Sequence, residues 1–428
     1  MRRVLQLATF RRLLVATVIN EIASAVGSVA LALLVYRRTG SAIGATGFFL
    51  CSQFAPALLS PSLVARLDGR PARRVLPALY TVEALIFLVL AWLVGRFSVA
   101  PALVLIVIDG VMFMSARVVA RATWTSMTAG EGLMREANAA INTMVAASNM
   151  LGPALGGALV AVGGTRAALL VNVLAFTLVA ITILTTQGLP QPQSADGIAI
   201  RRVRAALAYT RRSPLIRNLI CLEGVGVLFF TISIPVEVVL AQRTLHSGAG
   251  GYGTLLATWG AGAVAGSMMY ARWRRFASGT LMTAGACLLG VGFLAMSLAP
   301  SLLVAAVGAT VAGVGNGLQG VAARTAVQEA TPERWMALVL SLNESMFLGV
   351  PGLGILLGGA VATLAGPRPA LAVGAAGSLL VALAIPWLLR PAFGRSAPGA
   401  SVAAVRGEAR PAEPGGEARL GAAAVKPQ

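Results

Sequence analysis

Residues 156–166 read GGALVAVGGTR, and residues 358–368 read GGAVATLAGPR, so one glycine-rich stretch recurs after 202 residues. The same register connects two acidic residues inside apolar segments, Glu21 and Glu223, since 223 − 21 = 202. A period of this length is typical of a duplicated unit. The repeat therefore predicts two structurally similar halves related by pseudo-symmetry.

Composition places the chain in a lipid bilayer. Hydrophobic residues make up 57% of its 428 residues and charged residues 11%, and the mean hydropathy is +0.81. Soluble domains have about 45–50% and about 25%, respectively. The 34 basic residues outnumber the 15 acidic ones, but the arginines cluster in alternate connections, which indicates cytoplasmic loops and not a nucleic-acid interface. We expect a multi-pass protein of the inner (cytoplasmic) membrane with both termini in the cytoplasm.

Twelve apolar segments are long enough to span a membrane, because a spanning helix needs about 20 residues. We therefore expect an all-α membrane protein with twelve transmembrane helices in two pseudo-symmetric six-helix bundles. The outer connections are poor in charge, with Arg37 and Arg38 as an exception. The predicted helices cover residues 13–35, 42–64, 75–94, 99–123, 137–162, 166–187, 214–241, 250–271, 278–299, 302–324, 336–364 and 368–390.

The polar stretches between these segments predict the domain organisation. Residues 1–187 form an N-terminal six-helix bundle, and residues 214–390 form a C-terminal one. Between them, residues 188–213 make a basic cytoplasmic linker that is suited to an anionic membrane surface. Residues 391–428 are rich in Pro, Ala and Gly and have no apolar periodicity, so we expect a disordered cytoplasmic tail.

Cysteine and histidine usage argues against metal or disulfide chemistry. Cys51, Cys221 and Cys287 lie in apolar segments without disulfide or metal-ligand spacing, and His246 is the only histidine. We expect neither a metal site nor a cofactor. Without a nucleotide-binding loop, direct ATP hydrolysis is also disfavoured.

Three stretches carry a resemblance to a known family. Residues 65–74 read ARLDGRPARR, residues 148–157 read SNMLGPALGG, and residues 121–139 read RATWTSMTAGEGLMREANA. Together with twelve spans and a two-fold repeat, they resemble the major facilitator superfamily. The third stretch is similar to the branch of proton-coupled drug, enterobactin and macrolide exporters.

The resemblance implies roles for the first two stretches. The first resembles a gating loop that favours closure of one side, with Asp68, Arg70, Arg73 and Arg74 as its charged members; the acid is displaced by one position from the family pattern. The second resembles a helix-bend motif of proton-coupled exporters, formed by Gly152, Pro153, Gly156 and Gly157.

Polar side chains at membrane depth are costly, so each is a candidate for function. Glu21 and Arg117 lie roughly 13 Å and roughly 9 Å from the cytoplasmic side, counted at 1.5 Å per residue, so they are able to pair. In the resembled family the first, fourth, seventh and tenth spans line the cavity. We interpret Glu83, Glu237 and Glu344 as structural. The predicted proton-coupling and substrate residues are Asn20, Glu21, Asp109, Arg117, Glu223, Asn316 and Gln319.

These observations lead to one functional hypothesis and two alternatives. We expect a secondary active transporter, not an enzyme, that exports a small, largely apolar molecule by proton antiport through alternating access. Its partners are the substrate, protons and the lipid bilayer, and we expect a monomer. The first alternative is a proton-coupled or facilitative importer of a small metabolite. The second is a membrane sensor or enzyme.

Overall fold

The computed structural model describes residues 6–67, 70–96, 98–129, 133–186, 189, 209–273 and 275–389. All regular structure within these ranges is helical. Nine helical stretches in them are long and apolar enough to cross a membrane by length and composition. The linker predicted for residues 188–213 falls mostly, and the tail predicted for residues 391–428 entirely, outside this part of the chain.

The first half contains the elements of six spans. They are α2 (Ala8–Thr39), α3 (Ala42–Phe49), the π-helical turn η1 (Leu50–Phe54), α4 (Ala55–Leu67), α5 (Ala72–Leu93), the 3-10 turn η2 (Val94–Arg96), α6 (Val99–Ala129) and α7 (Met134–Leu184).

The second half repeats this order of spans. Its elements are α9 (Pro214–Thr231), α10 (Ser233–Val239), the π-helical turn η3 (Leu240–Thr244), α11 (Gly248–Trp273), α12 (Ser278–Leu298), α13 (Leu302–Ala330), α14 (Glu333–Leu364) and α15 (Pro367–Leu388). Residues 6–389 thus hold two six-helix bundles, once α7 is divided at its internal break.

The repeated glycine stretch marks equivalent turns in the two halves. Gly164 has φ 76° and ψ 171° inside α7, and Gly366, 202 residues later, has φ 96° and ψ 172° before α15. Only glycine adopts such angles without steric cost. The predicted connection between the helices at 137–162 and 166–187 is therefore a sharp break at one residue.

Two predicted spans are less regular than expected. Residues 42–64 include η1, and residues 214–241 divide into α9 and α10 and run into η3. Pro56 follows η1 and has no N–H, so the regular hydrogen-bond ladder is already weakened there. A hydropathy pattern registers the length of an apolar segment and not a local change in its helical pitch.

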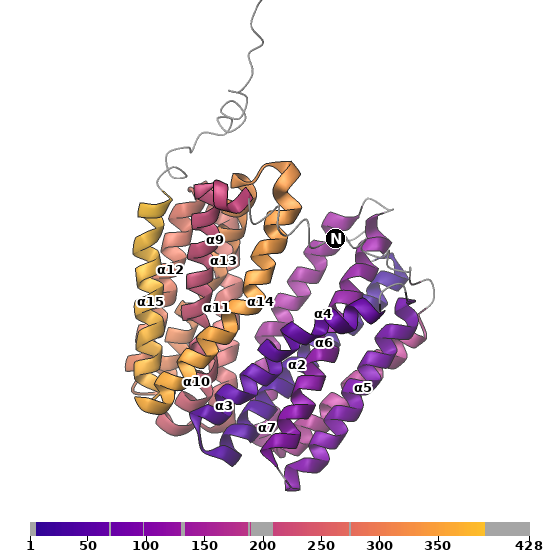
Figure 1. The fold of residues 1–428 in the computed structure, drawn as a ribbon. Coiled ribbons are helices and arrows are strands. Elements are labelled where there is room, and N and C mark those ends of the chain that lie inside the picture. Colours follow the sequence, from indigo (N-terminus) through magenta and orange to yellow (C-terminus); the bar gives the residue numbers. More distant parts are fainter. Residues whose placement is uncertain are drawn as a thin grey trace, which may run out of the picture.

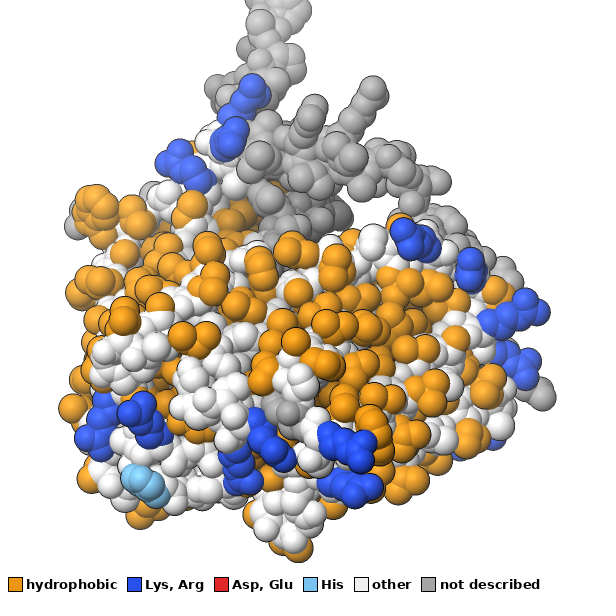
Figure 2. Space-filling view, turned by 60° about the horizontal axis from the view of Figure 1, so that its bottom comes forward, with side chains coloured by type: hydrophobic (Ala, Val, Ile, Leu, Met, Phe, Trp, Pro, Cys, Tyr) orange, Lys and Arg blue, Asp and Glu red, His pale blue; other side chains and the backbone are white. Residues whose placement is uncertain are grey.

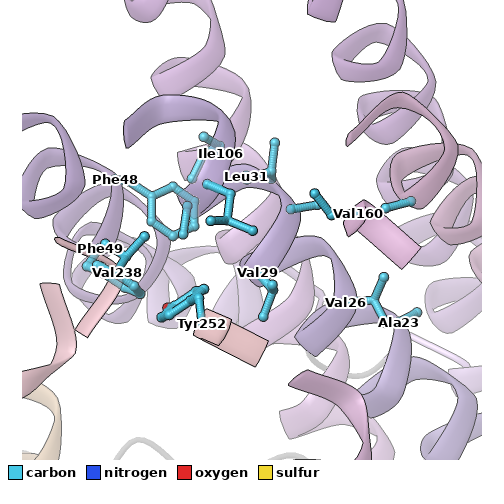
Figure 3. Packing of buried hydrophobic residues seen from close by; sticks show 14 of the residues in the cluster. Ala23, Val26, Val29, Leu31, Phe48, Phe49, Ile106, Val160, Val238 and Tyr252 are labelled. Atoms are coloured by element: carbon cyan, nitrogen blue, oxygen red, sulfur yellow. The ribbon is translucent and has the colours of Figure 1, made fainter. Parts of the chain in front are cut away.

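In Figure 1 the described helices of the two bundles lie close together at one end, and their ribbons are farther apart at the other. We call the end at which α2 begins and α15 ends the terminal end, and the opposite end the far end. One buried apolar cluster joins both halves at the far end, where Phe48 and Phe49 of α3 pack near Val238 and Tyr252 (Figure 3). A second buried cluster runs from Ile216 to Leu389 and contains only residues of the second half.

The far end is more basic than the sequence suggested. Figure 2, which turns this end toward the viewer, shows several arginine side chains on it. Two arginines at this end donate to carbonyl groups at the end of a non-consecutive helix: Arg38 Nη2 to Val94 O and Arg368 Nη2 to Ala299 O, each at 2.8 Å. These arginines bind orphan carbonyl groups at helix ends, a structural role that a loop-charge count does not register.

Candidate functional site

An ion pair crosses the interior of the first half. Glu21 is the fourteenth residue of α2, and its Oε1 atom is 3.2 Å from Nε of Arg117 on α6. The Glu21 side chain is 7% exposed, whereas that of Arg117 is 49% exposed and lies 5.6 Å above the ring of Phe113. The sequence-based expectation that these residues are able to pair agrees with this geometry. Glu21 is therefore buried, whereas the Arg117 side chain is half exposed.

Asn20 accompanies the ion pair on α2. It is buried, and its Oδ1 atom has no hydrogen-bond partner among the described residues. A buried amide oxygen without a partner costs free energy. Asn20 therefore offers an unused acceptor one residue before Glu21 on α2.

Asp109 belongs to a different pair of helices. It lies on α6 and interacts electrostatically with Glu83 on the neighbouring helix α5. Glu83 is 0% exposed, and within the described ranges neither of its carboxyl oxygens has a hydrogen-bond partner. The same holds for Oδ1 of Asp109. Asp109 thus lies on a helix that packs against the helix of Glu83, which the sequence analysis had interpreted as structural.

The second half contributes a smaller polar group. Glu223 on α9 is 7% exposed, the same fraction as Glu21 in the equivalent position. Asn316 and Gln319 lie one turn apart on α13 and are half-buried. A Cβ atom at Gly226 would be 3.3 Å from Nε2 of Gln319, so this amide lies against α9 about one turn from Glu223.

The gating loop is partly described. Asp68 lies outside the described residues, and Arg70, Arg73 and Arg74 are exposed at the terminal end. Arg73 donates from Nε and Nη2 to the carbonyl oxygen of Leu184, at 3.3 Å each. Since Leu184 is the last residue of α7, Arg73 interacts favourably with a helix C-terminus of its own half.

The helix-bend motif on α7 contacts both halves. A Cβ atom at Gly152 would be 2.5 Å from Cβ of Ala25, and one at Gly156 would be 3.0 Å from Cα of Val26, both on α2. A Cβ atom at Gly157 would be 2.8 Å from Cα of Gly253 on α11 in the other half. Pro153 lies inside the same helix. The motif therefore brings three backbones together where the halves meet.

The second half makes an equivalent contact with the first half. Gly359, 202 residues after Gly157, lies against Thr46 of α3. Gly358 lies against the backbone of Ile232, as Gly156 lies against Val26. Both halves thus use the same repeated glycines to approach the other half.

One polar residue escaped the sequence analysis. Asn172 of α7 is fully buried, and neither of its amide atoms has a hydrogen-bond partner in the described part of the chain. Its side chain occupies the space left free by Gly27, next to Phe87. Its position as a single asparagine inside the apolar run LLVNVLAF could have identified it as a candidate from the sequence. Among the residues that the structure describes, no group of three or more His, Cys, Asp or Glu could hold a metal ion.

Solved structures with a similar fold are transporters. A bacterial homologue of the iron transporter ferroportin, in the inward-facing state, is 16% identical with a TM-score of 0.72, covering 90% of this chain and 99% of that one. The nucleoside transporter NupG is 12% identical with a TM-score of 0.68, covering 90% and 100%. A bacterial homologue of the human lysosomal transporter Spinster is 15% identical with a TM-score of 0.63, covering 90% and 95%.

These likenesses show the fold and leave the substrate open. A search among curated proteins gives no match. The sequence matches the family described as transmembrane secretion effector over residues 4–401. The chain belongs to this family and is a membrane transporter of the major facilitator type.

Proposed function

We propose that the protein exports a small, largely apolar molecule across the cytoplasmic membrane in exchange for protons. The observation that carries this proposal is the ion pair between Glu21 and Arg117, with 3.2 Å between Oε1 and Nε. A carboxylate at membrane depth is costly and marks a functional site by default. Here it has one cationic partner, and that partner is half exposed.

The pair gives protonation a mechanical consequence. Ionised Glu21 holds Arg117 and links α2 to α6. Protonated Glu21 is neutral and releases the guanidinium group, which is then free to turn toward an accessible surface. Because the two protonation states differ in this contact, proton binding biases the equilibrium between conformations.

The contacts between the halves indicate where the two halves would move against each other. The halves meet at the far end through Gly157 with Gly253 and through Gly359 with Thr46. If the termini are cytoplasmic, as the arginine distribution indicates, this arrangement gives access from the cytoplasm. Rocking of the halves about the glycine contacts would then open the far end, which is the alternating-access motion of such folds.

Three observations favour export of an apolar molecule. The matched family is described as a secretion effector, and the helix-bend motif is similar to that of proton-coupled exporters. Among the described residues of α13, Gln319 is a polar side chain that lies against α9, about one turn from Glu223. In this scheme Glu21 carries the proton, while Asp68, Arg70, Arg73 and Arg74 bias closure of the terminal end. The protein works as a monomer in the bilayer, without a cofactor.

The experiment is a comparison of small molecules inside and outside cells that lack the protein. Cells with the gene deleted should accumulate one class of apolar compound internally, and the unaltered gene should reverse this. A lower internal concentration of a compound in cells that lack the gene would instead indicate import. An unchanged set of internal small molecules would contradict a transport role for this protein under those conditions.

A further inference from the structure

A groove lies between α5 and α7 on the surface of the first half. Its volume is about 350 Å³, and it is lined by Leu88, Val89, Ala91, Trp92, Arg166 and Leu170. Ala91 is buried, whereas the other apolar side chains of the lining are 40–61% exposed. An exposed apolar surface on a transmembrane protein is a contact site for lipid. The groove is therefore shaped and lined to receive an acyl chain.

The groove reaches an aromatic and basic rim at the far end. Trp92 is the last residue but one of α5, and Arg166 is the second residue after the break at Gly164. Tryptophan is enriched at this level, where membrane helices reach the water. The guanidinium carbon of Arg96 lies 5.9 Å from the centroid of the Trp92 ring. Two cations thus accompany Trp92, one in the lining of the groove and one above the ring.

The repeat shows that Arg166 is not used in the way that its copy is used. Arg368, 202 residues later, donates from Nη2 to the carbonyl oxygen of Ala299, the C-cap residue of α12, at 2.8 Å. The C-cap residue of α5 is Val94, and its carbonyl oxygen accepts from Arg38 instead. Within the described ranges, no hydrogen bond or ion pair holds the guanidinium group of Arg166.

The surroundings of Arg166 favour an anion. No acidic residue lines the groove, and Figure 2 shows arginine but no acidic side chain on the described part of the face that it draws. Arg166 lies in the first turn after the break, so the positive end of the helix dipole adds to its charge. A guanidinium group matches a phosphate group through two parallel hydrogen bonds.

We propose that this groove binds an anionic phospholipid from the leaflet at the far end. One acyl chain lies along Leu88, Val89 and Leu170, and the phosphate-bearing headgroup contacts Arg166 and Arg96. A zwitterionic headgroup brings a cation of its own next to these arginines, so the site prefers a lipid with net negative charge. Basic pockets between transmembrane helices bind anionic headgroups by the same chemistry. The inference does not depend on the transported substrate or on proton coupling.

Native mass spectrometry of the purified full-length protein in detergent tests the preference for charge. Phosphatidylglycerol is compared with phosphatidylcholine that carries the same acyl chains. We expect phosphatidylglycerol to bind more tightly, and Arg166→Gln to lower this preference about fivefold, the usual contribution of one arginine near a membrane surface. Arg368→Gln alters the equivalent arginine of the second half and is the matched control, which should leave the preference unchanged.

A second substitution tests the groove separately from the charge. Leu170→Trp fills the groove and leaves both arginines in place, so the variant should bind one phosphatidylglycerol molecule fewer. Equal binding of the two lipids by the unaltered protein, or an unchanged preference in Arg166→Gln, overturns the inference. An unchanged number of bound lipids in Leu170→Trp also overturns it, as does a second copy of the protein in place of the lipid.

Discussion

The two halves share one fold but differ in where they put charge. The first half has an arginine at position 117, the nineteenth residue of α6, and the nineteenth residue of α13 is Gly320. It also has Glu83 on α5 and Asp109 on α6, whereas α12 contains no charged residue and the acidic residue of α13 is Glu329, next to its last residue. The repeat thus accounts for the shared scaffold, whereas the cationic partner of Glu21 has no equivalent at the corresponding position of α13.

The difference also affects how closely helices pack. In the second half, glycines bring α12 and α13 into backbone contact: a Cβ atom at Gly308 would be 2.9 Å from the carbonyl oxygen of Gly292. In the first half, α5 and α6 carry carboxyl groups between them.

The largest effect is expected from placing a carboxyl group in the apolar core of the second half. Leu289→Glu places a carboxyl group in a site that is 2% exposed and closely packed. We expect a loss of more than about 4 kcal/mol in the free energy of unfolding, because overpacking and an unpaired buried group act together. Thermal unfolding in detergent measures this. The control Leu289→Met should cost less than about 1.5 kcal/mol, and equal stability of the two variants would contradict the comparison.

Removal of the cation tests the first half's own arrangement. Arg117→Leu leaves Glu21 buried without its ion-pair partner and should cost about 2–3 kcal/mol, less than for a fully buried pair because Arg117 is half exposed. Adding Glu21→Gln should restore most of that loss. A double-mutant cycle in thermal unfolding checks the coupling. Additive losses would show that the two side chains do not depend on each other.

A smaller effect is expected where the halves touch. Gly253→Ala introduces a Cβ atom 2.8 Å from Cα of Gly157, and overpacking of this kind costs about 1–3 kcal/mol. In the proposed alternating-access motion this contact exists only while the far end is closed, so the substitution should shift the protein toward opening there. Gly250→Ala, on the same helix but with no atom within 4 Å of its Cβ, is the matched control. Spin-label distances across the far end should change in the first variant only.

The smallest effect belongs to the gating loop. Arg73→Ala removes two hydrogen bonds to Leu184 O, but Arg73 is exposed. The conformation closed at the terminal end should therefore lose about 0.3–1 kcal/mol of stability, and this effect should shrink at high salt. Labelling of introduced cysteines at the terminal end measures the resulting change in accessibility. A salt-independent change would indicate lost packing and not lost charge.

The sequence was sufficient for the scaffold, because apolar length and a 202-residue repeat depend on local composition. It also indicated the depth of Glu21 and Arg117, since depth follows from helical rise. Whether Glu83 and Asp109 face each other depends on how α5 and α6 are rotated about their axes, which the sequence alone does not define. The π-helical turns η1 and η3 and the burial of Asn172 likewise depend on neighbouring helices. The gating and coupling roles of the candidate residues stay predictions.

Coupling by Glu21 is tested most directly with Glu21→Gln, which keeps size and hydrogen bonding but removes the titrating group. In inverted membrane vesicles, an imposed pH gradient drives uptake of the compound that accumulates in cells lacking the gene. In a second assay, exchange of labelled for unlabelled compound is measured without a gradient. We predict that gradient-driven accumulation is lost while exchange continues. Unchanged accumulation, with the same pH dependence as the unaltered protein, would show that Glu21 is structural and contradict the mechanism.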